Sequence, residues 1–446
     1  MDKILIFDIG KTNKKCYLFD AEFQIIEQEQ TVFPEIKDED GFVCDDVEKL
    51  TNWILEKFAY YKEYHAITAV NFSAYGASFV HLDKENNILT SLYNYLKPFD
   101  KQLEKKFFEN YGPVEKFESE TASPYMGFLN SGLQLYWLKN KHPKIAEQVK
   151  YSLHFPQYCS FLLSRKTNSE YTSIGCHTGL WDLEKRDYHD WVKKEDLTNI
   201  LAPIVSTDHF EEVDGVKVGV GIHDSSAALV PYLIGVKERF IVISTGTWSI
   251  VLNPFSKDTL TNNDLKNDCL QFMQIEGNPV KVSRLFLGKE HEIQNQNLAN
   301  HFGLGSDYFK MVLFDKNMYK NLKEKDQTAF HFEELTNENK YNSGFSRYAD
   351  FETAYHQLIF ELVKKQIFSL KLALGNTKDI KTVFIDGGFS NNELYCKMLA
   401  DMLPQFQIKV ASLASGSALG TAIVIQKDRF NKDIFEKVLK IKKVQP

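Results

Sequence analysis

Two segments of one design constrain the fold of this chain most: each is an apolar run, a polar turn with glycine and a second apolar run. The first spans residues 4–19 with Gly10 in its turn, and the second spans residues 240–252 with Gly246 in its turn. Continuous apolar runs are typical of strands that are buried on both faces. Because the pattern starts again near the middle of the chain, we predict a duplicated α/β fold.

The length of the chain suits two domains. Its 446 residues, of which 43% are hydrophobic, can bury a separate core in each half. We place the boundary near Gly235, just before the second apolar run, so that the predicted domains span 1–234 and 235–446. In the second half, the sequence predicts a long helix over 351–374.

The composition argues against several classes of protein. With 53 basic and 60 acidic residues the net charge is −7, which disfavours the basic surface that non-specific nucleic-acid binding requires. The apolar run Ile4–Phe7 is too short for a signal-peptide core, and no stretch approaches the roughly 18 apolar residues of a membrane span. The six cysteines are scattered without a C-x-x-C pair, which favours reduced thiols. We therefore expect a cytoplasmic protein without nucleic-acid or membrane partners, and we leave a homodimer open.

The turn of the first segment has the groups that a phosphate-binding loop needs. Its glycine lets backbone N–H groups approach a phosphate closely, its threonine and asparagine can donate hydrogen bonds, and its lysines supply positive charge. Asp8, at the end of the preceding strand, can hold Mg²⁺ directly or through water. An ordinary solvated turn is the alternative, and a P-loop is excluded because Leu5 stands where that motif needs glycine. The candidate phosphate-binding residues here are Gly10, Lys11, Thr12, Asn13 and Lys15.

The turn of the second segment repeats this design with Thr245, Gly246 and Thr247. Gly246 gives access to the backbone, and the two threonines offer hydroxyl groups. A polar β-turn is again the alternative. Two such turns in equivalent positions of the two halves predict a pair of loops that hold phosphates from opposite sides.

A carboxylate stands shortly before the second segment, where the predicted strand 216–222 leads into the predicted helix 225–233. Asp224 there could serve simply as a helix N-cap. It is also placed to accept the proton of a hydroxyl group during phosphoryl transfer, which a carboxylate does at neutral pH without a raised pKa. Both interpretations stay open at this point.

A further glycine turn follows an apolar run late in the chain. Gly387 and Gly388 have no side chains to block a flat base or a ribose. Ser390 and Glu393 show the S-x-x-E pattern of a capping box, which predicts that a helix begins there. The small-residue run 414–422 predicts another helix. Its small side chains would let it pack very closely on a neighbouring element beside a bound nucleotide.

Four motifs, in this order, resemble those of the FGGY family of carbohydrate kinases. They read D-I-G-K-T-N at 8–13, H-D-S-S-A-A at 223–228, S-T-G-T-W-S at 244–249 and D-G-G-F-S-N-N at 386–392. The resemblance is collinear over nearly the whole chain. It implies two actin-like (ribonuclease H-like) α/β domains with an interdomain active-site cleft, in which ATP and Mg²⁺ bind.

The resemblance also implies roles for individual residues. Asp224 matches the catalytic base and Asp8 the metal-associated acid. The positions that match the phosphate and adenosine motifs are Lys11 to Asn13, Thr245, Gly246, Thr247, Gly387, Gly388 and Asn391. The H-D-S pattern is most similar to the rhamnulokinase and fuculokinase branch, which implies a sugar site made of Gly76, Ala77, His223, Asp224 and Ser225.

The implied reaction is transfer of the γ-phosphoryl group of MgATP to a hydroxyl of a ketose, with L-rhamnulose or L-fuculose favoured. Another pentulose or a polyol, of the xylulose or ribulose type, is an alternative substrate, and a non-catalytic sugar- or nucleotide-responsive scaffold is an alternative function. The chain departs from the family in its first turn, where Thr-Ser or Ser-Ser commonly follows glycine, and at Tyr93–Lys97, where W-x-D-x-R is common. The sugar, and any contact that Lys97 or Trp181 makes with it, therefore stay open.

Overall fold

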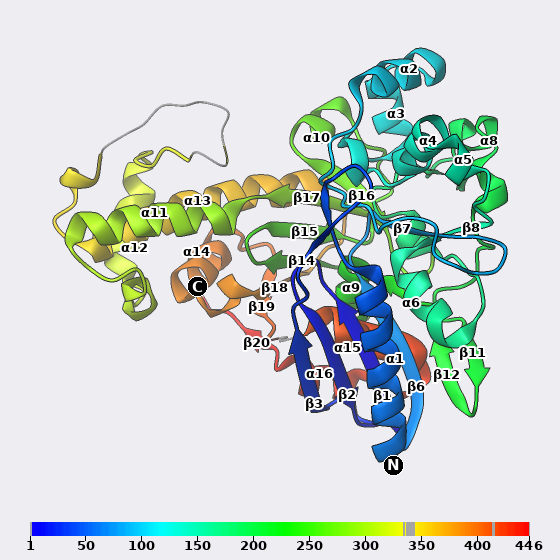
Figure 1. The fold of residues 1–446 in the computed structure, drawn as a ribbon. Coiled ribbons are helices and arrows are strands. Elements are labelled where there is room, and N and C mark those ends of the chain that lie inside the picture. The colour runs from blue at the N-terminus through cyan, green and yellow to red at the C-terminus, as the bar shows by residue number, and fades with distance from the viewer. Residues whose placement is uncertain (1, 333–334, 336–343, 413–414, 446) are drawn as a thin grey trace.

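The computed structural model describes residues 2–332, 335, 344–412 and 415–445, and these fold around two seven-stranded sheets (Figure 1). The first sheet consists of β1 (Lys3–Ile9), β2 (Lys14–Phe19), β3 (Ile25–Thr31), β6 (Ile67–Ala74), β11 (Phe210–Val213), β12 (Val216–Gly219) and β13 (Ile222–His223). In this sheet β3, β2 and β1 form an antiparallel meander, and β6 and β12 follow β1 in parallel. β11 lies antiparallel to β12 at the edge, and the short β13 pairs with β6.

The second sheet repeats this arrangement. Its strands are β14 (Phe240–Thr245), β15 (Ser249–Asn253), β16 (Cys269–Met273), β17 (Pro279–Leu285), β18 (Thr382–Gly387), β19 (Gln407–Val410) and β20 (Lys442–Lys443). Here β17, β15 and β14 form the meander, and β18 and β19 are the parallel strands. The same order of five strands in both halves confirms the predicted duplicated α/β fold. The predicted boundary near Gly235 falls between the end of helix α9 (Asp224–Gly235) and β14, and it stays a prediction.

Helices cover both faces of each sheet, and two of them, α9 and α15 (Gly416–Ile425), lie between the sheets. Along β1, Ile4 and Ile6 face this central layer, whereas Leu5 and Phe7 face the outer helices. Val242 of β14 belongs to the same central core. The outer helices are α1 (Val47–Tyr64) and α6 (Phe155–Ser164) on the first sheet, and α11 (Leu287–Phe302), α13 (Phe351–Leu374) and α14 (Glu393–Met402) on the second. In Figure 1, α11 and α13 extend to one side of the second sheet.

The two central helices approach each other most closely at Gly420. A Cβ atom there would lie 1.8 Å from the carbonyl oxygen of Ala227, so this crossing requires glycine. Asn71 of β6 donates a hydrogen bond to the carbonyl oxygen of Thr421 (3.2 Å), which ties the first sheet to α15. The close packing predicted for the run 414–422 is confirmed for its described residues, whereas Ala414 lies outside them.

The predicted capping box at Ser390 is wrong. Ser390 lies in the 3₁₀ turn η5 (Gly388–Asn391), where its hydroxyl donates to the carbonyl oxygen of Gly387 (2.7 Å). Asn392 is the N-cap of α14 instead, and its side chain accepts a hydrogen bond from the N–H of Tyr395 (3.0 Å). The helix therefore begins after the glycine turn has closed on itself.

The strand predicted over 216–222 is interrupted. Gly221 has φ +82°, and its N–H donates to the side-chain oxygen of Asn71 (3.1 Å). The chain therefore leaves the sheet after Gly219 and returns to it as β13. This break places Asp224, rather than Ser225, at the first position of α9.

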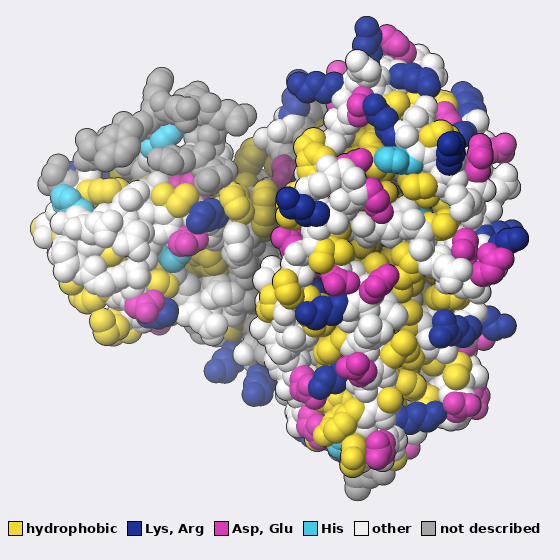
Figure 2. All heavy atoms as spheres, in the orientation of Figure 1, with side chains coloured by type: hydrophobic (Ala, Val, Ile, Leu, Met, Phe, Trp, Pro, Cys, Tyr) yellow, Lys and Arg dark blue, Asp and Glu magenta, His cyan; other side chains and the backbone are white. Residues whose placement is uncertain are grey.

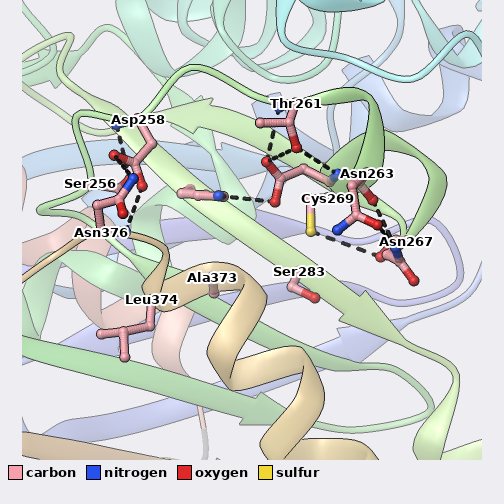
Figure 3. A network of polar contacts seen from close by, with 12 residues as sticks. Ser256, Asp258, Thr261, Asn263, Asn267, Cys269, Ser283, Ala373, Leu374 and Asn376 are labelled. Carbon is pink, nitrogen blue, oxygen red and sulfur yellow. Dashed lines mark hydrogen bonds and ion pairs between the residues drawn. The ribbon is translucent and has the colours of Figure 1, made fainter.

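At the β16–β17 edge of the second sheet, polar and charged side chains form a network in which they contact one another (Figure 3). Thr261 and Asp264 form a capping box at α10 (Asn262–Lys266), and the Lys281 ammonium lies 3.1 Å from the Asp264 carboxylate. Asp258 accepts a hydrogen bond from the N–H of Asn376 (2.8 Å), next to the end of α13. These contacts hold loops to the sheet, so the network is structural.

The surface shows mixed charges. Figure 2 shows Lys and Arg side chains interspersed with Asp and Glu over the face in view. No helix among the described residues is long and apolar enough to cross a bilayer. The six cysteines are buried, unpaired thiols, as the sequence predicts.

Candidate active site

A cleft of about 280 Å³ lies between the two halves and is lined by residues of both. A larger hollow of about 510 Å³ beside α13 is lined by Phe330, Glu361 and Phe368 among others, and no residue predicted for the site lines it. The cleft, although smaller, is therefore the candidate active site. Its lining residues are Asp224, Ser225, Ala228, Val242, Ser244, Ile250, Leu252, Asp386, Gly387, Gly416 and Ser417.

Asp224 lines this cleft, and 31% of its side chain remains exposed. Its Oδ1 accepts hydrogen bonds from the N–H (2.5 Å) and the hydroxyl (3.1 Å) of Ser225, while no described residue donates a hydrogen bond to Oδ2. Burial raises the pKa of Asp224 to about 6, because the walls of the cleft remove water from a carboxylate whose two hydrogen bonds only partly oppose the shift. His223, not Asp224, is the N-cap of α9, so the simple N-cap reading and the expectation of an unshifted pKa are both wrong.

His223 and Gly76 lie together beside Asp224. The Nε2 atom of His223 is 3.3 Å from Asp224 Oδ1. Burial lowers the pKa of His223 to about 3, so the neutral ring does not offset the charge of the carboxylate. A Cβ atom at Gly76 would lie 3.2 Å from the His223 ring and 2.1 Å from the sulfur of Cys176. The structure thus brings these two predicted sugar-site residues into contact, while the neighbouring Ala77 is buried and has φ +66°.

Each half carries a carboxylate that is hydrogen-bonded to a serine on the adjacent parallel strand, half-buried at Asp8 and buried at Asp386. Asp8 of β1 accepts a hydrogen bond from Ser73 of β6 (2.6 Å), and Asp386 of β18 is hydrogen-bonded to Ser244 of β14. Because β1 and β14 are equivalent strands, the acid and the serine have exchanged places between the halves. Burial raises the pKa of both Asp8 and Asp386 against these hydrogen bonds. Sequence reasoning missed Asp386 as a site residue, because aligning S-T-G with D-I-G shows only that Ser244 stands where the first half has Asp8.

Asp8, the acid that the sequence predicts to hold a metal, also contacts the second half. Ser417, at the start of α15, donates a hydrogen bond to its Oδ2 (3.0 Å), and the charge of Asp224 adds to the raised pKa of Asp8. A cation would relieve this repulsion, and Mg²⁺ usually needs only one or two protein carboxylates beside water and phosphate oxygens. The described residues contain no group of three or more acidic, His or Cys side chains suited to a metal. These residues therefore fit a magnesium ion that is held partly by a nucleotide.

Two lysines of the first turn pair with acidic side chains, and one of them is Lys14, whose ammonium lies 2.8 Å from Asp45. The Lys11 ammonium lies 2.6 Å from Asp45 and 3.3 Å from Glu35. Lys15, in contrast, lies close enough for its charge to lower the pKa of Asp8 against the larger effect of burial. Of these lysines, Lys15 is the one whose charge acts on Asp8.

The rest of the first turn leaves few groups for a ligand. The N–H of Gly10 donates to the carbonyl oxygen of Asn13 (2.9 Å), which closes the turn. The side-chain oxygen of Asn13 accepts a hydrogen bond from Gln30 (2.8 Å), so its NH₂ group can still donate outward. Thr12 is exposed.

The second turn touches the late glycine turn. The Thr245 hydroxyl donates to the carbonyl oxygen of Asp386 (2.5 Å) and accepts a hydrogen bond from the N–H of Phe389 (3.0 Å). A Cβ atom at Gly387 would lie 1.9 Å from the carbonyl oxygen of Thr245. Thr245 thus fixes the position of the glycine turn instead of offering a free hydroxyl. The exposed residues of the two turns are Gly246, Thr247, Trp248, Gly387, Gly388 and Asn391.

Lys97 and Trp181, whose roles the sequence left open, do not line the cleft. The Lys97 ammonium is buried between Asp38 (2.8 Å) and Asp40 (2.7 Å). Trp181 is 7% exposed and packs edge-on against Tyr188. Lys97 therefore stabilises the first half, whereas Trp181 belongs to a buried cluster with Met273 of the second half.

The chain matches known proteins over most of its length. The FGGY family of carbohydrate kinases, N-terminal domain, matches residues 3–246, and the carbohydrate kinase FGGY, C-terminal domain, matches residues 237–320. The rhamnulokinase of Oceanobacillus iheyensis is 25% identical over 94% of this chain and 92% of its own length. The rhamnulokinase of Halalkalibacterium halodurans is 27% identical over 54% of this chain and 52% of its own length.

Solved structures share the fold. A carbohydrate kinase from Novosphingobium aromaticivorans superposes with a TM-score of 0.79 at 21% identity, covering 95% of this chain and 91% of that one. A xylulose kinase from Lactobacillus acidophilus superposes with a TM-score of 0.77 at 14% identity, covering 100% and 93%. Since the N-terminal family match alone spans more than half of the residues, the chain belongs to the FGGY family of carbohydrate kinases and is a sugar kinase, with ATP as the implied co-substrate.

Proposed function

We propose that this protein transfers the γ-phosphoryl group of MgATP to a hydroxyl group of a ketose of the L-rhamnulose or L-fuculose type. One observation carries the proposal. Asp224 lines a cleft between the two halves, its carboxyl group has a raised pKa, and its Oδ2 accepts no hydrogen bond from a described residue. The likeness to proteins named rhamnulokinase supports the sugar class. The likeness to a xylulose kinase concerns the fold alone and keeps another pentulose or a polyol as the second candidate.

The cleft supports an in-line transfer. The sugar hydroxyl donates to Asp224 Oδ2 and gives it the proton as the hydroxyl oxygen attacks the γ-phosphorus. A new O–P bond forms while the bond to the β–γ bridging oxygen breaks, so ADP leaves. Ser225 holds Oδ1 and thereby fixes the direction in which Oδ2 points. Mg²⁺, held by Asp8, would neutralise charge on the phosphate oxygens.

The other predicted residues take places around this reaction. We place the sugar against Gly76 and His223 in the domain 1–234, and the nucleotide in the domain 235–446. The ATP phosphates lie between Thr12–Asn13 and Gly246–Thr247, and the adenosine lies at the exposed late turn formed by Gly387, Gly388 and Asn391. Lys15 supplies the positive charge of the first turn.

The pH dependence of the reaction tests the base. Asp224 accepts a proton only when it is ionised, and burial raises its pKa to about 6. With saturating MgATP, kcat/KM for the sugar is therefore expected to be constant above about pH 7 and to fall as the pH drops through 6, by about tenfold per unit below it. A pH–rate profile from pH 5 to 9 measures this. An acidic limb near pH 4 would contradict the raised pKa.

A panel of sugars tests the substrate class. L-rhamnulose, L-fuculose, D-xylulose, L-ribulose and glycerol can be compared in a coupled assay for ADP release. We expect kcat/KM for one of the two 6-deoxyketoses to exceed that for the pentuloses and glycerol by at least about tenfold. A preference for D-xylulose or glycerol would support the second candidate instead, and the kinase chemistry would be unaffected.

A further inference from the structure

A buried carboxylate outside the cleft, Glu170, is surrounded by neutral donors. Its side chain has 0% exposure. It accepts hydrogen bonds from two backbone N–H groups at the start of α7 (Tyr171–Ile174), those of Thr172 (2.8 Å) and Ser173 (2.7 Å). It also accepts hydrogen bonds from the hydroxyls of Thr172 (2.7 Å) and Thr207 (2.8 Å), and from the side-chain amide of Gln157 (3.5 Å). A carboxylate is costly to bury, and this one is stabilised only because so many donors converge on it.

Two of these donors, Thr172 and Gln157, also form hydrogen bonds with the short segment that precedes Asp224. The Thr172 hydroxyl has a single proton, which it gives to Glu170, so its oxygen is left to accept the N–H of His223 (3.0 Å). The Gln157 amide has two protons and gives one to the carbonyl oxygen of Gly221 (2.7 Å). Both ends of the segment Gly221–His223 are therefore held by side chains that contact Glu170.

This segment needs such support. It follows the break between β12 and β13, and β13 has only two residues. Gly221 has φ +82°, and a Cβ atom there would lie 2.3 Å from the carbonyl oxygen of Pro156. The backbone is thus pressed against α6 in a conformation that other residues rarely adopt, directly before the base.

We propose that Glu170 is a positioning residue for phosphoryl transfer. Through Thr172 and Gln157 it fixes the backbone of Gly221–His223, and this sets the direction of the Asp224 carboxylate towards the sugar hydroxyl. The inference rests on the proposed role of Asp224 as the base. Misplacement of a reacting group by a fraction of an ångström to 1 Å lowers a rate by up to about 100-fold, so a loosened segment should be visible in kcat.

Two matched substitutions test the proposed positioning of the segment Gly221–His223. Thr172→Val and Thr207→Val each remove one buried hydroxyl that donates to Glu170, but of these two hydroxyls only that of Thr172 also accepts the N–H of His223. We expect Thr172→Val to lower kcat by about tenfold with KM for MgATP unchanged, and Thr207→Val to stay within about twofold of the wild type. Thr172→Ser, which keeps the hydroxyl, should restore kcat.

Amide hydrogen exchange at residues 221–224 gives a readout that needs no turnover. Exchange at His223 should be faster in Thr172→Val and unchanged in Thr207→Val. Equal losses of kcat in the two valine variants, or equal exchange rates at the His223 amide, would contradict the proposed positioning role. A wild-type protein that phosphorylates none of the sugars would contradict the proposed function alone, because the exchange comparison would still decide whether Thr172 holds the segment.

Discussion

Replacement of Asp224 by asparagine is expected to lower kcat by at least about 100-fold, since the variant cannot accept the proton of the sugar hydroxyl. Asparagine has nearly the same shape and can still accept hydrogen bonds from Ser225 at the Oδ1 position. The affinity for the sugar should therefore change little. Steady-state kinetics gives kcat, and titration calorimetry with the sugar alone gives the affinity.

The stability of the same variant separates a catalytic loss from misfolding. The folded-state pKa of Asp224, about 6, lies above the ordinary value of an aspartate carboxyl group. At any pH above about 6, the ionised carboxylate therefore lowers the stability of the folded protein. The neutral amide removes this cost, and the melting temperature at pH 7.5 should be equal to or higher than that of the wild type. Near-normal kcat in a folded variant would rule out Asp224 as the base.

Replacement of Gly387 by alanine is expected to destabilise the protein by on the order of 3 kcal/mol and to lower the affinity for ATP by at least about tenfold. Gly387 has φ +79° and ψ −156°, a region that is nearly restricted to glycine. A Cβ atom would also lie 1.9 Å from the carbonyl oxygen of Thr245, which is backbone and cannot swing away. The second phosphate turn and the late glycine turn would therefore separate. Denaturant unfolding and nucleotide titration measure the two effects.

The next residue offers the control. Gly388 is also exposed, but a Cβ atom there would lie 3.9 Å from the same carbonyl oxygen, an ordinary contact. It lies in the 3₁₀ turn η5, whose backbone suits alanine. Gly388→Ala should cost less than about 1 kcal/mol. Similar losses in the two variants would show that the side chain itself, rather than the close approach at Gly387, disturbs the turn.

Much of the fold could be predicted because it depends on local patterns. The apolar runs 4–7 and 240–243 are buried strands, and the helix predicted over 351–374 has those bounds in the structure. Helix starts were harder to predict. The S-x-x-E pattern at Ser390 predicts a cap, but the preceding turn uses that hydroxyl, and a neighbouring asparagine serves equally well.

The motifs predict candidate site residues, but they do not predict the contacts of these residues. The sequence identifies Asp224 and Gly387, which line the cleft together. It could not show that Lys11 pairs with Asp45, 34 positions away, because nothing in the turn itself indicates that acid. The role of Glu170 could not be predicted for the same reason. Its connection to His223 passes through Thr172 and exists only in the folded chain.

The placement of α15 has a consequence for synthesis of the chain on the ribosome. The helix packs on β1 and β6, yet its last residue, Ile425, follows Ala74 of β6 by 351 positions. At roughly 5–20 residues per second, the part of the first sheet that α15 covers stays uncovered by that helix for roughly 20–70 s after β6 is made. A chain that stops before residue 416 would present this apolar face to chaperones and proteases, although every strand of the first sheet is complete.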